Sequence, residues 1–77
     1  MKYRKIYGFL VSLGKELQDY AEHLQISRQQ LSNKKNSDAF KADDLIMLAD
    51  LTDTTLALVD KNGKVVVEFT KEDLSKK

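Results

Sequence analysis

The side chains with the most suggestive chemistry lie together at residues 27–29, which read Ser27, Arg28 and Gln29. Side chains of these types reach the edges of bases and the phosphates of double-stranded DNA. An arginine can donate two hydrogen bonds to O6 and N7 of guanine, and a glutamine or asparagine amide can pair with N6 and N7 of adenine. If a helix presents this segment to solvent, DNA is the first partner to expect.

Two short helices joined by a tight turn would position these side chains. Apolar residues at positions i, i+3, i+4 and i+7 predict a helix over residues 17–24: Leu17, Tyr20, Ala21 and Leu24. A turn follows at Gln25 and Ile26, and a second helix begins at Ser27. Ser27 and Gln30 have the spacing of a capping box, and Leu31 is placed to anchor this helix to a core. Polar residues 36–38 are expected to end it.

Two further helices are predicted around this pair. A stripe of apolar residues at helical spacing favours a helix over residues 2–13, made by Ile6, Phe9, Leu10 and Leu13. Gly14 is a suitable terminator. Phe40 is expected to be buried in the next loop, and residues 42–51 form a fourth helix with Asp43 and Asp44 in its first turn, where the helix dipole favours anions.

The pattern changes to strands after residue 54. Residues 55–59 and 64–70 are β-branched and alternating, and Asn62-Gly63 between them predicts a hairpin. Two registers are open. A two-residue turn at Asn62-Gly63 puts one apolar set on a common face: Leu56, Leu58, Val65, Val67 and Phe69. A three-residue loop with Gly63 in a bulge groups Ala57 and Val59 with Val65, Val67 and Phe69 instead. We favour the first, because register follows the better apolar face.

Composition limits the class of protein. The chain has no cysteine and one histidine, which disfavours disulfides and metal sites. With 77 residues it can bury only a small core, and small domains of this kind are often stabilised further by oligomerisation. No apolar run approaches the length of a membrane span, so we expect a cytoplasmic protein. The net charge is only +1, but residues 1–41 hold eight basic and four acidic side chains, whereas residues 42–77 hold five and eight. The basic half contains the predicted helix pair.

The residues at 21, 24, 26, 27 and 31 resemble the helix-turn-helix of phage repressors of the Cro and CI type, the xenobiotic-response-element family of bacterial regulators. The matching residues are Ala21, Leu24, Ile26, Ser27 and Leu31, and Asn36 matches an Asn that often follows the recognition helix. The resemblance covers roughly residues 1–53. The expected fold is therefore mainly α with a C-terminal β-hairpin (α+β): a four-helix Cro/CI-like domain over residues 1–70, with the hairpin at about 55–70 and a charged, frayed tail at 71–77.

The resemblance also implies roles for individual residues. The residues expected to contact bases lie at the exposed start of the second helix of the pair: Ser27, Arg28, Gln29, Ser32 and Asn33. The residues expected to contact phosphates are Gln18, Lys34, Lys35 and Lys41. Two positions depart from the family pattern. Gln25 stands where glycine is usual, so it must adopt either a left-handed backbone, which is unfavourable for a residue other than glycine, or a slightly different turn. Lys34 stands where an apolar residue is frequent, so its methylenes would cover the core while its ammonium points to phosphate.

The leading hypothesis is a sequence-specific DNA-binding protein, a homodimeric regulator (repressor) of a phage or mobile element. It would bind a near-palindromic operator and pair through the hairpin residues of the first register. The alternative is a protein-interaction module on the same scaffold (an inhibitor, antitoxin or conjugation or anti-defence accessory protein), with Asp43, Asp44, Asp50 and Asp53 as its contact surface. We expect no enzyme activity, cofactor, metal, membrane or small-molecule ligand. His23 is predicted on the outer face of its helix.

Overall fold

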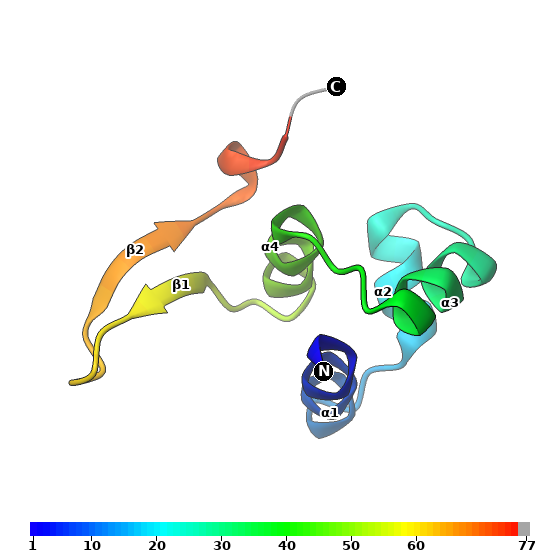
Figure 1. Cartoon of the computed structure of the whole chain (residues 1–77), viewed down its shortest axis with the longest axis horizontal. Coiled ribbons are helices and arrows are strands. Elements are labelled where there is room, and N and C mark those ends of the chain that lie inside the picture. The colour runs from blue at the N-terminus through cyan, green and yellow to red at the C-terminus, as the bar shows by residue number, and fades with distance from the viewer. Residues whose placement is uncertain (76–77) are drawn as a thin grey trace.

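Four helices and one hairpin follow one another along the chain, as described over residues 1–75 by a computed structural model (Figure 1). The elements are α1 (Lys2–Ser12), α2 (Leu17–Leu24), α3 (Arg28–Ser37), α4 (Ala42–Leu51), β1 (Leu56–Val59) and β2 (Val65–Phe69). A short 3-10 turn, η1 (Lys71–Asp73), follows the hairpin. The expected arrangement of four helices and a two-stranded antiparallel hairpin is confirmed, with element ends within two residues of the predicted ones.

Local hydrogen bonds define where the helices begin. The Gln30 amide donates to the Ser27 hydroxyl at 3.1 Å, and the Ser27 amide donates to Gln30 Oε1 at 2.8 Å, so the predicted capping box is present. The amides of Glu16 and Lys41 donate to the carboxylates of Asp19 and Asp44 in the same way. At the end of α1, Gly14 adopts a φ of 72°, a left-handed conformation that suits glycine.

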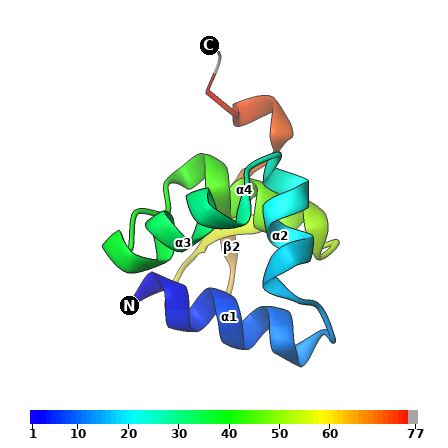
Figure 2. The ribbon, with the colours of Figure 1, turned by 90° about the vertical axis from the view of Figure 1, so that its right-hand side faces the viewer.

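The core lies where α1, α2, α3 and α4 converge (Figure 2). Its buried residues come from all four helices and the loop before α4: Ile6, Leu10, Tyr20, Ala21, Leu31, Phe40 and Leu48. Tyr20 is fully buried, and its hydroxyl donates to the Asp44 carbonyl at 2.7 Å, so the polar end of the ring is satisfied. Burial, together with the nearby Asp44 carboxylate, raises the pKa of Tyr20. Phe40 is buried as predicted.

The hairpin extends away from the helices, with its turn at the far end of the molecule (Figure 1). Near the helices Leu56 pairs with Phe69 and Leu58 with Val67, which is the register that we favoured. A bulge after Leu58 then shifts the register, so that Val59 pairs with Val65. The tip is accordingly the three-residue loop of the other register.

The loop geometry explains this mixture of registers. The Gly63 amide donates to the Asp60 carbonyl, the Asp60 amide donates to the Lys64 carbonyl, and Gly63 has a φ of 85°. These bonds form a type I turn followed by a left-handed glycine bulge. The Asp60 carboxylate also accepts hydrogen bonds from the amides of Asn62 and Lys64. The hydrogen bonds of the turn therefore determine the register at the end of the hairpin far from the helices, and the bulge allows the other register, with its apolar pairs, near the helices.

Residues 71–75, which we expected to fray, lie against α4. The backbone turns at η1, whose first residue Lys71 forms an ion pair with Asp50, with Nζ 3.3 Å from Oδ1. The Ser75 amide donates to the Asp43 carboxylate at 3.2 Å. Lys76 and Lys77, the rest of the predicted tail, lie outside the described residues. Within residues 1–75, no helix has the length and apolar character needed to cross a bilayer.

Candidate nucleic-acid interface

The connection between α2 and α3 is a tight turn without glycine. Gln25 has φ 60° and ψ 42°, so of the two alternatives for this position the left-handed backbone is the one that is found. The Ile26 amide donates to the Ala21 carbonyl at 3.1 Å, and the Gln25 amide donates to the Glu22 carbonyl at 3.0 Å. These bonds close the end of α2 and direct the chain into α3. Ile26 is half-buried and packs against the core.

α3 is the most polar helix of the domain and presents most of its surface to solvent. Leu31 is its only buried residue, whereas Arg28, Gln29, Asn33 and Lys35 are exposed. The Gln29 side-chain amide donates to Asn33 Oδ1 at 3.1 Å, which links two of the predicted base-contacting residues. In this pair Gln29 keeps its carbonyl oxygen and one N–H for other partners, the groups that an adenine edge requires.

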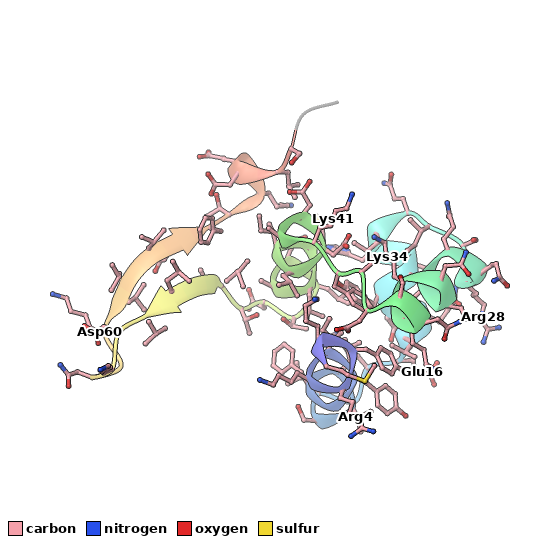
Figure 3. All side chains as sticks on the ribbon, viewed as in Figure 1. Arg4, Glu16, Arg28, Lys34, Lys41 and Asp60 are labelled. Atoms are coloured by element: carbon pink, nitrogen blue, oxygen red, sulfur yellow. The ribbon has the colours of Figure 1, made fainter. Side chains whose placement is uncertain are left out.

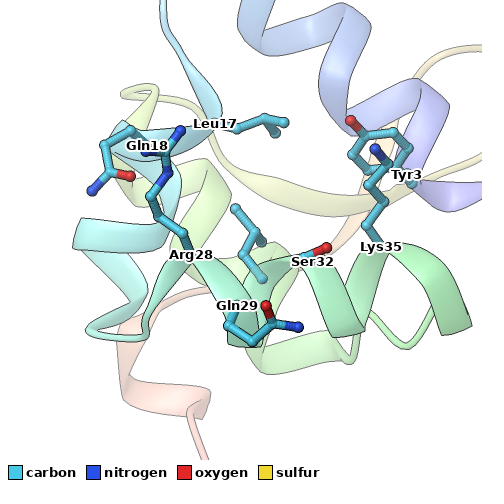
Figure 4. Close-up of a pocket in the computed structure, with 8 residues that line it drawn as sticks. Tyr3, Leu17, Gln18, Arg28, Gln29, Ser32 and Lys35 are labelled. Atoms are coloured by element: carbon cyan, nitrogen blue, oxygen red, sulfur yellow. The ribbon is translucent and has the colours of Figure 1, made fainter.

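A groove of about 380 Å³ lies beside this helix (Figure 4). Its floor includes Leu17 and Leu31, and polar or cationic side chains surround it: Gln18, Arg28, Gln29, Ser32 and Lys35. The structure thus brings five of the nine predicted DNA-contacting residues together around one groove. Asn33 on the same helix and Ser27, the residue that caps it, lie outside the groove, and Lys34 and Lys41 do not line it.

Tyr3, which the sequence analysis did not place in the site, also lines the groove. Its ring lies under the Lys35 ammonium, with Nζ 5.2 Å from the ring centroid, and stacks between Tyr7 and Phe40 at 5.9 and 6.5 Å. This brings the start of α1 beside the second half of α3. No local pattern could have indicated it, because Tyr3 and Lys35 are far apart in the chain and meet only through the core.

Asp38, directly after α3, holds the start of α1 in this place. Its carboxylate accepts hydrogen bonds from the amides of Tyr3 at 3.0 Å and Lys2 at 3.3 Å. The bond from the Tyr3 amide is the main cause that lowers the pKa of Asp38, and the Lys2 amide and ammonium lower it further. The same carboxylate therefore caps α1 and joins it to the end of α3.

The Lys34 ammonium, which was expected to point to a DNA phosphate, is bound instead by a carboxylate of the protein. Nζ lies 2.9 Å from Oδ2 of Asp44, in an ion pair whose side chains are 25% and 12% exposed. The Asp44 carboxylate also accepts the Lys41 amide. The reason is tertiary: α4 packs against α2 with its first turn close to the end of α3, so the nearest anion to Lys34 is a carboxylate of the protein. Lys34 therefore links α3 to α4.

The other predicted phosphate contacts differ in how available they are. Lys35 and Lys41 are exposed, and Lys41 stands immediately before α4. The Gln18 side-chain amide donates to Glu22 Oε1 at 3.2 Å, and its carbonyl oxygen is buried and accepts no hydrogen bond in the described part of the chain. The Ser27 hydroxyl already accepts the Gln30 amide, which leaves its proton and one lone pair for another partner.

His23 faces α4, contrary to its predicted position on the outer face of α2. Its Nε2 lies 2.7 Å from Oδ2 of Asp50, and both side chains are about 30% exposed. This contact is the largest cause that lowers the pKa of Asp50, and Lys71 on the other carboxylate oxygen contributes as well. The pair joins α2 to α4, and Lys71 extends the link to η1.

The acidic residues considered for a protein-binding surface are mostly engaged within the chain. Asp44 is buried and bonds to Lys34, Asp50 bonds to His23 and Lys71, and Asp43 accepts the Ser75 amide. Residues 1–75 contain no cluster of three or more histidine, cysteine, aspartate or glutamate side chains that could hold a metal ion. Comparison of the chain with protein-family models, with curated proteins and with solved structures found no match.

Proposed function

We propose that this protein binds double-stranded DNA sequence-specifically by placing α3 in the major groove. In this proposal α2 and α3 form a helix-turn-helix of the Cro and CI type, and the protein acts as a transcriptional regulator, a repressor of a phage or mobile element. Arg28, Gln29 and Asn33 contact base edges, with Ser27 and Ser32 beside them, and Gln18, Lys35 and Lys41 contact phosphates.

One observation carries this proposal. The outward surface of α3 exposes an arginine and two amides, while Leu31 alone is buried beneath them. Arg28 and Lys35 stand at the border of a groove that also exposes Gln18 and Ser32 (Figures 3 and 4). Side chains that recognise bases are thus next to cations suited to phosphates, and no ion pair within residues 1–75 neutralises Arg28 or Lys35.

We infer that the binding form is a homodimer joined through the hairpin. The hairpin exposes several large apolar residues, among them Leu58, Val65 and Val67 at 59%, 46% and 42%, and the helical part exposes a second group on or beside α1: Met1, Tyr7, Val11 and Leu13. Isolated two-stranded hairpins are marginally stable in water, so a second copy would stabilise this one. A two-fold pair would present two copies of α3 to successive major grooves about 34 Å apart, which suits a near-palindromic operator.

Selection of bound DNA from a random pool, followed by fluorescence anisotropy on the recovered site, tests the proposal. We expect a near-palindrome whose affinity falls steeply as the salt concentration rises. Arg28→Ala should reduce discrimination at one base pair by about 1–3 kcal/mol, whereas Lys35→Ala should weaken binding to all sequences similarly and lower the salt slope by about 1. Lys61→Ala is the matched control, since it removes a cation from the hairpin turn, next to Asp60, which Figure 3 shows at the opposite end of the molecule from Arg28.

The outcomes separate the two functions under consideration. Failure to bind any DNA at low salt would refute the proposal. Copurification of a defined protein with a chain that does not bind DNA would favour the interaction module instead. If Arg28→Ala and Lys61→Ala change the affinity for a selected site equally, the protein binds DNA but α3 is not the element that contacts the bases.

A further inference from the structure

The outer face of α1 exposes apolar side chains that no other element covers. α1 runs along one side of the helical body, and no helix or strand of the described chain lies beyond it (Figures 1 and 2). Tyr7 and Val11, one helical turn apart, are 47% and 54% exposed, and Met1 and Leu13 at the ends of the helix are exposed as well. The Tyr7 ring stacks on Tyr3 at 5.9 Å, which holds it in place at the surface. An exposed apolar patch of this kind is a common sign of a binding surface.

Gly8 lies in the middle of this face, and nothing in residues 1–75 requires a glycine there. Its φ is not positive, and an added Cβ would meet no atom within 4 Å. In a helix interior glycine is destabilising relative to alanine, so the fold alone would favour a larger residue. The residues three and four positions away surround it on the helix surface: Arg4, Lys5, Val11 and Ser12. Without a side chain at Gly8, a partner can approach the backbone of α1 closely.

The same helix is positively charged. Residues 1–15 contain four cations and no aspartate or glutamate. Arg4 and Lys5 are exposed, none of the ion pairs within residues 1–75 includes them, and Figure 3 shows the Arg4 side chain pointing away from the body. The dipole of α1 disfavours cations in its first turn, so these two residues do not stabilise their own helix. They are instead available to attract an acidic partner.

We propose that the outer face of α1 binds an amphipathic helix of another protein, one that carries acidic side chains beside an apolar stripe. The apolar stripe packs on Tyr7 and Val11 and approaches α1 most closely at Gly8. The acidic side chains pair with Arg4 and Lys5, which gives the contact its specificity. The surface includes neither α3 nor the hairpin, so this proposal goes beyond DNA binding and does not depend on it.

The charges and the glycine favour this partner over three others. A second copy packed through α1 would bring together four cations from each chain and no acid from residues 1–15. DNA phosphates would attract Arg4 and Lys5 but offer no apolar surface to Tyr7 and Val11. A bilayer surface would accept both cations and apolar side chains, but a glycine at the centre of the helix would only reduce the apolar area that it buries.

Two synthetic helical peptides test the chemistry of the partner. The acidic peptide has leucine at helical spacing, glutamate beside the leucines and alanine elsewhere, and the basic peptide has lysine in place of every glutamate. We expect fluorescence anisotropy to show that the full chain binds the acidic peptide about 10-fold more tightly than the basic one. NMR chemical-shift changes of the backbone amides should centre on α1. Equal affinities, no binding of the acidic peptide, or changes centred on α3 would overturn the proposal.

Substitutions on α1 separate binding from folding. Gly8→Leu should weaken binding of the acidic peptide about 10-fold by blocking close approach, although leucine is the better helix former and should not lower the stability. Val11→Ser removes apolar surface and should weaken binding about 10-fold, and Arg4→Glu about 5-fold. The matched controls are Val59→Ser, at a valine that is 55% exposed, and Lys61→Glu, both of which should leave the affinity unchanged. Urea unfolding checks that each variant is folded. Controls that weaken binding as much as the α1 variants, or a Gly8→Leu variant that binds like the wild type, contradict the proposal.

Parallel measurements identify the other partners. If Arg4→Glu weakens binding to selected DNA but not to the acidic peptide, the cations of α1 contact DNA and the proposal is wrong. If sedimentation equilibrium shows that Gly8→Leu dissociates a dimer of the wild type, a second copy occupies this face, and the proposal is again wrong. Binding to vesicles of anionic phospholipid without binding to the acidic peptide would assign the face to a bilayer. Selective binding of the acidic peptide through α1 by a chain that binds no DNA would uphold this proposal and refute the DNA-binding function.

Discussion

The ion pair between Lys34 and Asp44 should contribute measurably to the stability of the domain. Its Nζ–Oδ2 distance is 2.9 Å, and the side chains are only 25% and 12% exposed. A hydrogen bond to a charged group typically contributes about 1.5–3 kcal/mol. Because Lys34 remains a quarter exposed and solvent screens the pair, we take the lower end, about 1.5 kcal/mol.

Two substitutions isolate this interaction. Lys34→Met keeps most of the side-chain stem and removes the ammonium, and Asp44→Asn keeps an oxygen that can accept the Lys41 amide. Each should lower the free energy of unfolding by about 1.5 kcal/mol, since each leaves a largely buried charge without its partner. The double variant should lose little more than either single one, which gives a coupling energy of about 1 kcal/mol.

Urea unfolding followed by circular dichroism measures these changes. For a domain of this size the slope is about 1 kcal/mol per M, so each single variant should unfold at a urea concentration roughly 1.5 M lower. Lys35→Met is the matched control: Lys35 is the next residue and exposed, and its contact with the Tyr3 ring contributes about 0.5 kcal/mol. Additive losses in the double variant, or equal losses for Lys34→Met and Lys35→Met, would refute the reasoning.

Three further predictions concern the backbone and the caps. The wild type should have a higher free energy of unfolding than Asp38→Asn above about pH 3.9, the unfolded-state pKa, and this difference should be lost as the pH falls through the lower folded-state pKa. Urea unfolding at several acidic pH values tests this, and a difference that does not change with pH would contradict it. Gln25→Gly should raise the free energy of unfolding by about 0.5 kcal/mol, because glycine relieves the left-handed backbone at φ 60°; a lower urea midpoint would count against it. Gly8→Ala should stabilise α1 by about 0.5–1 kcal/mol, since an added Cβ meets nothing within 4 Å, whereas Gly14→Ala should destabilise by about 1 kcal/mol because its φ is 72°; thermal melting that ranks the two in the opposite order would exclude this explanation.

Much of the local structure could be predicted from the sequence because its determinants lie within a few residues of one another. Apolar spacing in α2 and the Ser27–Gln30 capping box are patterns of one helical turn, and both are present. The left-handed backbone at Gln25 follows from the short connection between two helices. The exposed polar surface of α3 was also predictable, since only Leu31 among its residues is suited to a core.

The hairpin was predictable only in part. Two strands around Asn62-Gly63 were expected, and both alternative registers were derived from alternation and turn length. Each register proves to hold over one part of the hairpin, because the turn prefers a glycine bulge at Gly63 while the apolar pairs near the helices prefer the other alignment. The bulge between Leu58 and Val59 joins the two registers, and neither the turn nor the apolar pairing predicts it by itself.

The types of the main helices and strands, and the set of polar side chains on α3, follow from local sequence patterns, since they depend on contacts about one turn apart. Which of those side chains are available, and what surrounds them, depends on how the helices pack. Lys34 is bound to Asp44, His23 to Asp50, and Tyr3 lies beneath Lys35 at the groove. These partners come from separate helices, so only the packing of α1 and α4 around the core brings them together.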